Sequence, residues 1–526
     1  MSRERILFVT SNGTGLGHLT RSMAIARRLG PELEPLFFTF SEAAPVVRQV
    51  GFPVEYMASH GSRGAGNDWR WSRRVGPRLR VAIAEAEPRA LVFDGILPYD
   101  PLLAAMRSVP VTVWCRRGLW RRGASAVPLT RAARFDAVLE PGELAAGEDR
   151  GPTRARRGEA HQVAPIVFSD DEELLSRSEA ERELSLEPEM TTVLVQLGQG
   201  AEVGAAQARC LRALAGRQGV QVAAISSAIA GLVEVPEGIV HLRAPYPISR
   251  YYAAFDLAVS AAGYNAFHEL IRFGVPSLFV PMERETDDQA ARARHAERSG
   301  VGVAAEGPGD PGLEGVLEAL LDPDRRGAMR ERLDELRPAN GAAEAAEWLE
   351  ELAARGAPGA AGGERAASNR RWRGAAPGLG PRLGRAGGWL RSVPRTLARL
   401  GSQSVSQPRP RSLVVALGEE GEGLERGVRA ALERLAEPPE EVLVVTDSLA
   451  IGALRRLGVA VEHVPAPSER QAALADGDYE AFLRRRLGLI LARRPRFRRA
   501  SAVGEVPGEL LAAATARLRR RARLLR

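Results

Sequence analysis

The chain has 526 residues, 73 basic and 65 acidic side chains and a net charge of +8, and every basic side chain is arginine. At roughly 100–200 residues per domain, this length predicts two to four domains. Two cysteines exclude a disulfide framework and a cysteine-based zinc site, and no apolar run is long enough to predict a membrane-spanning helix.

The net charge is unevenly distributed along the chain. Residues 355–410 hold eleven arginines and one glutamate, and residues 484–526 hold fourteen arginines and two glutamates, so the other 427 residues carry a charge of −14. Because the net positive charge is confined to these two segments, we expect no nucleic-acid partner. The N-terminus lacks the pattern of a signal peptide, so we expect a cytoplasmic protein.

Residues 1–354 alternate short apolar runs with helical patterns, which is typical of parallel sheets covered by helices on both faces. The runs expected to form strands are residues 6–10, 35–40, 90–95 and 109–115, then 191–198, 220–226, 238–242, 256–261 and 276–281. The predicted fold class is therefore α/β, with two doubly wound, Rossmann-like domains at residues 1–165 and 166–354.

The remaining residues predict a linker and a third domain. Residues 355–410 are rich in Gly, Pro and Arg and poor in large apolar residues, as a flexible linker is. Within them, residues 388–400 have the pattern of a basic amphipathic helix, which either lies on an anionic membrane surface or is ordinary linker. Residues 411–526 predict a small α/β domain that ends in a basic helical tail, with strands at 412–418, 441–447 and 459–465.

The first candidate site is the glycine-rich turn of residues 11–21, between a strand and a helix. Gly13, Gly15 and Gly17 let the backbone approach a ligand, and the following helix N-terminus favours an anion. His18 follows the carboxyl end of the strand, where open α/β sheets place their ligands, and an imidazole there is suited to taking a proton from a hydroxyl. The alternative is that His18 only caps the helix.

The second candidate site is residues 260–294. A strand leads through Gly263 into a helix that contains Glu269, and the next strand leads into the polar loop 283–289. The helix N-terminus favours a phosphate, and a carboxylate in the helix is suited to ribose hydroxyls. Because both loops follow the carboxyl ends of strands, we expect them to line one pocket. The alternative is a helix-capping Asn265 beside solvated acidic residues.

Residues 260–294 resemble the donor-binding signature of GT-B fold glycosyltransferases, which include the lipid-II-forming N-acetylglucosaminyltransferase and the UDP-glycosyltransferases. The family signature reads H-C-G-W-N-S-x-x-E, then P-x-x-x-x-P and D/E-Q. Here residues 261–269 read A-A-G-Y-N-A-F-H-E, followed by Pro276, Pro281 and Asp288-Gln289. The resemblance covers about residues 1–352. Ala261 replaces the first histidine of the signature, so part of the phosphate affinity must come from elsewhere.

The resemblance implies roles for individual residues on the donor side and the acceptor side. The implied donor contacts are Gly263, Tyr264, Asn265 and Ala266 for the diphosphate, Glu269 for the ribose, and Asp288 and Gln289 for the sugar. The N-terminal turn is similar to the acceptor loop of the family, whose histidine is the base in many members. This similarity implies His18 as the base and places Gly15, Gly17, Thr20 and Arg21 near the acceptor.

Residues at two other strand ends of the first domain are further candidates. Asp94 is expected to orient His18 or to meet the acceptor hydroxyl. Arg116 and Arg117 either bind an acidic or phosphorylated acceptor, because guanidinium pairs well with phosphate, or form a solvated basic turn.

Three residues of the second domain are second-choice donor contacts. Gly198 and Gly200 follow its first strand, at a position where related enzymes approach the donor phosphates, or they form a plain turn. Tyr246 precedes the signature, where the family borders the base, and either stacks on the base or is an ordinary core or surface tyrosine.

These residues predict an inverting glycosyltransferase that moves a sugar from a nucleoside diphosphate, a UDP-sugar by resemblance, to an acceptor hydroxyl. The acceptor would be lipid-linked or otherwise anionic and would belong to cell-envelope, polysaccharide or glycolipid synthesis. We expect no cofactor and no metal, because Asp322-Pro-Asp324 and Asp476-Gly-Asp478 do not end strands at the expected cleft. The arginine-rich segments are expected to contact anionic lipid at the inner face of the membrane.

Three other functions remain open at this point. A GT-B fold sugar-nucleotide 2-epimerase would share the donor cleft but need no acceptor. A sugar-nucleotide-binding scaffold would bind the donor without turnover. A nucleic-acid binder would show affinity that falls steeply with salt.

Overall fold

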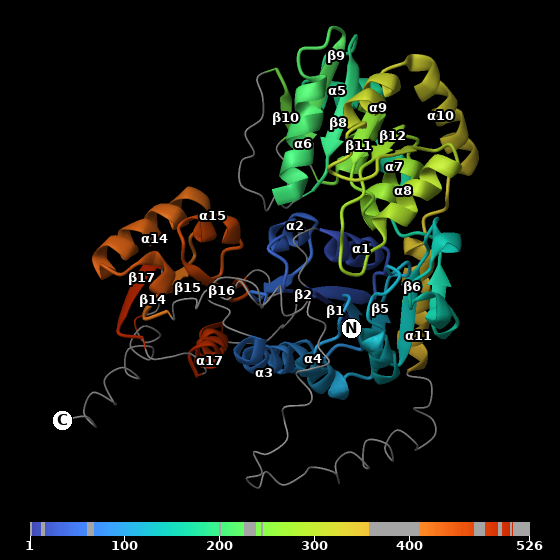
Figure 1. Cartoon of the computed structure of the whole chain (residues 1–526). Helices are drawn as coiled ribbons and strands as arrows, with labels where there is room; N and C mark the ends of the chain where they lie inside the picture. Colours follow the sequence, from blue (N-terminus) through green and yellow to red (C-terminus); the bar gives the residue numbers. More distant parts are fainter. Residues whose placement is uncertain are drawn as a thin grey trace, which may run out of the picture. The chain divides into compact units, whose positions relative to one another are not determined.

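The computed structural model describes residues 3–11, 16–59, 68–198, 201–225, 238–242, 246–356, 410–467, 479–492 and 497–504, with residues 506 and 508. Three β-sheets follow one another along the chain, and helices pack against them (Figure 1). The possible amphipathic helix at 388–400 lies outside the described residues.

The first sheet has seven strands in the order β3-β2-β1-β4-β5-β6-β7. The strands are β1 (Glu4–Thr10), β2 (Leu33–Thr39), β3 (Val54–Tyr56), β4 (Ala90–Asp94), β5 (Val111–Cys115), β6 (Ala137–Pro141) and β7 (His161–Val163). The helices between them are α1 (Gly17–Ala26), α2 (Ala44–Gln49), α3 (Asp68–Ala86) and α4 (Asp100–Ala105). β1 and β2 run parallel with Phe8 opposite Phe37, and these rings stack with centroids 5.2 Å apart.

The second sheet has six parallel strands in the order β10-β9-β8-β11-β12-β13. The strands are β8 (Thr191–Gln196), β9 (Val220–Ile225), β10 (Val240–Leu242), β11 (Leu257–Ser260), β12 (Ser277–Phe279) and β13 (Val303–Ala304). The helices are α5 (Arg177–Leu184), α6 (Ala201–Leu214), α7 (Tyr264–Arg272), α8 (Gln289–Arg298), α9 (Leu313–Leu320) and α10 (Pro323–Leu336). The last helix of this segment, α11 (Ala342–Arg355), packs instead against the first sheet, where Trp348 stacks on His161 of β7 with ring centroids 4.6 Å apart (Figure 1). The strands are nearly continuous apolar runs because helices cover both faces.

The third sheet has four parallel strands in the order β16-β15-β14-β17. The strands are β14 (Ser412–Leu417), β15 (Val442–Thr446), β16 (Ala460–His463) and β17 (Arg499–Gly504), and the helices are α14 (Gly421–Leu435), α15 (Ile451–Arg456) and α17 (Tyr479–Ala492). The predicted α/β fold class, with two doubly wound sheets and a smaller third sheet, is confirmed.

The structure corrects the expectation for the C-terminal end. The sequence predicts a basic helical tail from residue 484, but α17 continues to Ala492 and residues 499–504 form β17, which pairs with β14 along its full length. The sequence R-A-S-A-V-G has weak strand propensity, so pairing with β14 determines this strand. The helix residue Arg486 is buried rather than exposed. Its guanidinium is therefore not available to an anionic surface.

The described chain divides into two compact units. The first consists of Met1–Val54, Val92–Pro98 and Val113–Glu350, and the second of Glu55–Leu91, Tyr99–Thr112 and Glu351–Arg526. The third sheet therefore belongs to the same unit as α3 and α4. Among the described residues, no helix has both the length and the hydropathy needed to cross a bilayer.

Candidate functional site

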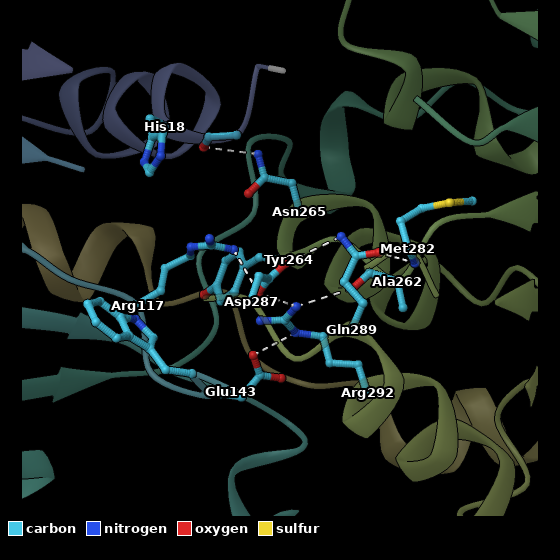
Figure 2. A network of polar contacts seen from close by, with 12 residues as sticks. His18, Arg117, Glu143, Ala262, Tyr264, Asn265, Met282, Asp287, Gln289 and Arg292 are labelled. Carbon is cyan, nitrogen blue, oxygen red and sulfur yellow. Dashed lines mark hydrogen bonds and ion pairs between the residues drawn. The ribbon is translucent and has the colours of Figure 1, made fainter. Parts of the chain in front are cut away.

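The candidate site lies where the strand order of two sheets reverses. The chain reverses between β1 and β4 in the first sheet and between β8 and β11 in the second. Open parallel sheets bind ligands beside such reversals, at the carboxyl ends of the strands. α1 follows β1, α7 follows β11, and Asn265 Nδ2 on α7 donates to the Gly17 carbonyl oxygen on α1 at 3.3 Å (Figure 2). The N-terminal ends of two helices therefore meet at the predicted site.

His18, in the first turn of α1, is hydrogen-bonded to Asp94 at the end of β4. His18 Nδ1 lies 2.6 Å from Asp94 Oδ1, and Arg21 Nε donates to Asp94 Oδ2 at 2.9 Å. The side chains of Asp94 and Arg21 are 1% exposed, whereas that of His18 is 14% exposed. The structure thus shows the predicted contact of Asp94 with His18 and adds Arg21 to it, and His18 is the most accessible of the three.

The surroundings of this group keep His18 neutral. Burial alone would raise the pKa of Asp94, but Arg21 and His18 outweigh burial and hold that pKa below its ordinary value. Burial lowers the pKa of His18 below its ordinary 6.5, although Asp94 opposes this shift. At neutral pH, the ionised Asp94 therefore accepts the Nδ1 proton of a neutral imidazole, and the lone pair on Nε2 remains able to take a proton.

The N-terminus of α7 offers backbone donors and one unsatisfied side-chain atom. The first helical hydrogen bond runs from Phe267 N to Gly263 O at 2.9 Å, so the N–H groups of residues 264–266, including Ala266, are not used within the helix. Asn265 Oδ1 is buried and has no hydrogen-bond partner among the described residues. A buried acceptor without a partner is costly unless a ligand supplies a donor.

The side chain of Tyr264 has a structural position. It is 3% exposed, and its hydroxyl accepts from Ile166 N at 3.1 Å and donates to Gly142 O at 2.9 Å. The Arg21 guanidinium also lies over the Tyr264 ring, with Arg21 Cζ 5.3 Å from the ring centroid. The implied diphosphate contact of Tyr264 is therefore limited to its backbone N–H.

Glu269, one turn further along α7, is a buried carboxyl group with 7% exposure. Burial raises its pKa to about 7, and a hydrogen bond with the Phe168 backbone partly opposes this increase. Because this pKa lies near neutral pH, a hydroxyl that donates a hydrogen bond to the carboxylate changes the fraction of Glu269 that is ionised. Its role as a ribose ligand remains a prediction.

The loop after β12 is held by a network of ion pairs centred on Asp287. Asp287 is 8% exposed, and its Oδ1 accepts from Arg117 Nη1 at 3.2 Å and from Arg292 Nη1 at 2.8 Å (Figure 2). Arg292 Nε donates to Glu143 Oε2 at 2.8 Å, and Glu143 Oε1 lies 3.3 Å from His268 Nε2. Burial would raise the pKa of Asp287, but Arg117 and Arg292 lower it, so this carboxylate is ionised at neutral pH.

Backbone contacts reinforce this network. Trp120, in the loop after β5, forms an antiparallel bridge with Asp287. Arg121 N donates to Thr286 O at 2.7 Å, and Asp288 N donates to Leu119 O at 3.2 Å. The loop after β5 and the loop after β12 are therefore bound to each other through both side chains and backbone.

The two predicted sugar contacts differ in their surroundings. Asp288 is the N-cap of α8, and its Oδ1 accepts from Ala291 N at 3.0 Å. Gln289 is 5% exposed, with Oε1 accepting from Met282 N at 2.9 Å and Nε2 donating to Asp287 Oδ2 at 3.4 Å. Both residues are thus held in place by the α8 terminus and the Asp287 network.

A pocket of about 760 Å³ opens at these residues, within the 300–1,000 Å³ typical of ligand sites. Its walls come from the loop after β5, the start of α6, the loop after β12 and the loop after β13. The lining residues are Arg121, Arg122, Ala205, Pro281, Met282, Glu283, Arg284, Asp287, Asp288, Gln289, Ala290, Glu306, Gly307, Pro308 and Gly309. The predicted pair Asp288 and Gln289 thus lies at a cavity, whereas residues 263–269, which were expected to line the same pocket, are not among its lining residues.

Other predicted contacts lie elsewhere. Arg116 has a side chain that is 1% exposed, donates to Glu140 Oε2 at 3.1 Å and pairs with Glu159. These carboxylates already neutralise the buried Arg116 guanidinium, which an acidic acceptor would have to contact. The structure therefore contradicts the anion contact predicted for Arg116. Arg21 is likewise committed to Asp94. It positions that carboxylate, and its guanidinium is not open to an acceptor.

The tyrosine predicted to stack on a base is packed against the protein. Tyr246 donates to Thr20 Oγ1 at 3.3 Å, and its ring lies 5.1 Å from that of Phe168, tilted by 59°. These contacts connect Tyr246 to α1. Gly198 follows β8 with a φ of +91°, a left-handed conformation that favours glycine. Gly13, Gly15 and Gly200 lie outside the described residues.

Sequence reasoning missed Arg292 and Glu143 and did not commit to Asp287. Arg292 lies three residues after Gln289 and therefore on the same face of α8, so this spacing could have predicted that Arg292 lies near the site. Glu143 gives no such signal, because it meets Arg292 across 149 residues. Among the described residues, no group of His, Cys, Asp and Glu is arranged to hold a metal ion.

Comparison with known proteins identifies a class for this part of the chain. Residues 245–309 match the glycosyltransferase family 28 C-terminal domain. This segment contains β11, α7, β12 and α8, and so includes every implied donor contact from Gly263 to Gln289. The resemblance to GT-B glycosyltransferases that residues 260–294 predict is confirmed by this match.

Similar proteins include UDP-N-acetylglucosamine–N-acetylmuramyl-(pentapeptide) pyrophosphoryl-undecaprenol N-acetylglucosamine transferases. The chain is 43% identical to that of Synechococcus sp. (strain RCC307) over 75 residues, which are 14% of this chain and 21% of the relative. It is 34% identical to that of Aquifex aeolicus (strain VF5) over 134 residues, which are 24% of this chain and 39% of the relative. The chain thus spans well under half the length of these relatives.

A solved structure is also similar over a longer range. MurG of Acinetobacter baumannii aligns with 66% of this chain and 99% of its own length, at 15% identity and a TM-score of 0.44.

Proposed function

We propose that this protein is a GT-B glycosyltransferase that moves a sugar from a nucleoside diphosphate, most simply a UDP-sugar, to an acceptor hydroxyl. The observation that carries the proposal is the family 28 match at residues 245–309, because it falls on the helix terminus and the pocket loop of the candidate site. The similar transferases act on a pyrophosphoryl-undecaprenol acceptor, so a lipid-linked acceptor at the inner face of the membrane is part of the proposal.

The donor diphosphate would lie at the N-terminus of α7. Backbone N–H groups of residues 264–266 and the helix dipole stabilise negative charge there, and they do so most when the leaving diphosphate gains charge in the transition state. Asn265 Nδ2 donates to the Gly17 carbonyl oxygen in the first turn of α1. The N-terminus of α1 would therefore also lie near the diphosphate. The ribose would then reach Glu269, and the sugar would reach Asp288 and Gln289 at the pocket.

The acceptor hydroxyl would be activated by His18. Its oxygen attacks the anomeric carbon of the sugar, its proton passes to His18 Nε2, and the bond from that carbon to the diphosphate oxygen breaks with its electron pair on the leaving group. Asp94 accepts the Nδ1 hydrogen bond at 2.6 Å and stabilises the imidazolium that forms. A single displacement of this kind inverts the anomeric centre. Arg121, which lines the pocket, pairs with Glu283, and Arg117 pairs with Asp287.

A panel of nucleoside-diphosphate sugars tests the proposal by thermal shift and by release of free nucleoside diphosphate. We expect a UDP-sugar to raise the melting temperature of the wild type and to release UDP only when an acceptor is present. Acceptor-dependent release distinguishes transfer from 2-epimerisation. Glu269→Ala should lose the shift, whereas Glu331→Ala, an exposed site on α10, should keep it. The proposal fails if no sugar nucleotide stabilises the wild type.

A further inference from the structure

The second compact unit contains a cluster of buried charges that joins residues 55–91 to the C-terminal sheet. Glu55 on β3 accepts from Arg78 Nη2 on α3 at 2.7 Å and from Arg486 Nη2 on α17 at 2.8 Å. Arg486 Nη2 also donates to Glu85 on α3 at 2.9 Å. α17 lies beside α3 (Figure 1). A single arginine of the C-terminal module (residues 410–504) therefore neutralises two carboxylates of the earlier segment.

The exchange of charge runs in both directions. Glu462 on β16 belongs to the C-terminal module. Its Oε1 lies 3.4 Å from Arg74 Nη1, and its Oε2 lies 3.5 Å from Arg78 Nη1, both on α3. The C-terminal module thus provides a glutamate that pairs with arginines of α3 and an arginine that pairs with glutamates of β3 and α3. Burial alone would lower the pKa of Arg78, but Glu55 and Glu462 outweigh burial and raise it. The carboxylates of both segments therefore act on the same guanidinium.

Hydrogen bonds to uncharged acceptors surround these ion pairs. Arg78 Nη2 donates to the His463 carbonyl oxygen at 2.8 Å, and Tyr56 N donates to His463 Nδ1 at 3.2 Å. Arg455 Nη2 on α15 donates to the Tyr56 hydroxyl at 2.8 Å. Backbone atoms of β3 and β16 take part, so the contact depends on the position of the strands as well as on side-chain charge.

The cluster is buried to the degree expected inside a domain. The side chains of Arg78, Glu55, Glu462 and Arg486 are 2% to 8% exposed. Ion pairs between tethered domains that touch only at their surfaces remain largely hydrated and contribute little. Charges buried this deeply are tolerated only with their specific partners in place, so this surface selects against any partner that lacks the matching acid and arginine.

We propose that the C-terminal module is a resident partner of β3 and α3, recognised through this charge exchange, and that the two segments form one cooperative unit. The surface of β3 and α3 is then an internal interface, fitted to a second segment that presents one glutamate and one arginine at the spacing of Glu462 and Arg486. The association does not depend on the covalent connection through residues 357–409. The proposal is independent of the glycosyltransferase function.

Hydrogen exchange on the full chain, followed by mass spectrometry, tests the cooperative unit. Arg486→Ala should accelerate exchange in α3 by about tenfold or more, because α3 loses the partner of Glu85. Arg485→Ala, at an exposed position of the same helix, should leave α3 unchanged. Reciprocally, Glu85→Gln in α3 should accelerate exchange in α17. Unchanged protection of α3 in Arg486→Ala, even if the module itself unfolds, would overturn the proposal.

Cleavage of the full chain gives an independent readout. A specific protease site is inserted after residue 380, complete cutting is verified on a denaturing gel, and the products are separated by size exclusion. The wild-type fragments should elute together, and those of the double variant Glu462→Gln, Arg486→Ala should separate. Separation of the wild-type fragments, or joint elution of the double variant, would contradict recognition through the charge exchange.

Discussion

Two buried charge networks in this molecule are built from similar parts and differ in what surrounds them. The network of Asp287 contains two carboxylates, two arginines and a histidine, and it borders a pocket of about 760 Å³. The network of Glu55 contains three carboxylates and three arginines, and protein segments enclose it. Burial and pairing alone do not distinguish the two.

The position of each network at its sheet distinguishes them. Asp287 follows the carboxyl end of β12, beside the strand reversal where parallel sheets bind ligands. Glu55 lies within β3, the edge strand of the first sheet, and meets a second segment of the chain. Of these two networks, the one that opens toward a cavity belongs to the candidate site, and the one enclosed by protein forms an interface between two segments of the chain.

The largest effect is expected beside the first network, at the proposed base. His18→Ala should reduce kcat by about 10²–10⁴-fold, because general-base catalysis is lost. Sugar-nucleotide affinity should stay unchanged, since His18 does not contact the donor in the proposal. Initial rates and calorimetric titration with the donor measure the two effects. A variant with wild-type kcat would exclude His18 as the base.

Breaking each network separates a functional role from a structural one. Arg292→Met and Arg486→Met should each destabilise the protein by about 3–5 kcal/mol, because the first leaves Glu143 and the second leaves Glu85 without its arginine. Arg292→Met should also weaken donor binding, since Asp287 and Gln289 lose their support at the pocket. Arg486→Met should leave donor affinity at the wild-type value. Equal donor affinity in the two variants would contradict the assignment of a functional role to the Asp287 network and a structural role to the Glu55 network.

The pH dependence of donor binding sharpens the comparison at Glu269. With a pKa of about 7, Glu269 is largely protonated below pH 7, and ionisation makes it a better acceptor for ribose hydroxyls. Donor affinity should therefore rise with pH through 7, by at most about tenfold per pH unit for one proton. Titrations at pH 6, 7 and 8 measure this slope, and Glu269→Gln should abolish it. A slope that persists in the variant would assign the proton to another group.

The same carboxyl group makes a prediction about stability. Its pKa in the folded protein lies above its ordinary 4.5, so the folded state favours the proton, and stability is lost as pH rises from 4.5 through 7. Glu269→Gln should consequently stabilise the protein at pH 8, by at most about 3 kcal/mol, and have little effect near pH 4.5. Chemical denaturation at both pH values checks the sign. Destabilisation at pH 8 would contradict it.

The smallest effect is expected at an exposed pair that belongs to neither network. Arg426→Ala removes a partner of Glu422 on α14, where the two side chains are 73% and 91% exposed. Solvent screens such pairs, so the change in unfolding free energy should stay within about 0.5 kcal/mol. Denaturation of this variant beside Arg486→Met provides the reference for a solvated ion pair.

The sequence predicted nine strands of the two large sheets, because these strands are buried on both faces and appear as continuous apolar runs. It missed β3, β6, β7 and β13, of which all but β6 have only two or three residues. It also missed the strand at residues 499–504, whose conformation comes from pairing with β14, a contact that local propensity does not contain. In the site, Gly263, Glu269 and Gln289 could be placed from a local signature. Arg116 was misplaced because its partners, Glu140 and Glu159, lie 24 and 43 residues away.

The separation between Glu55 and Arg486 has a consequence for biosynthesis. These two residues are 431 positions apart. At about 5–20 residues per second, a nascent chain would expose Glu55 and its neighbours for roughly 20–90 s before α17 is made. Residues 55–91 would then be among the first segments translated and among the last to reach their final packing. Termination before residue 486 would release a chain with an unfinished surface, which would be a substrate for chaperones and proteases.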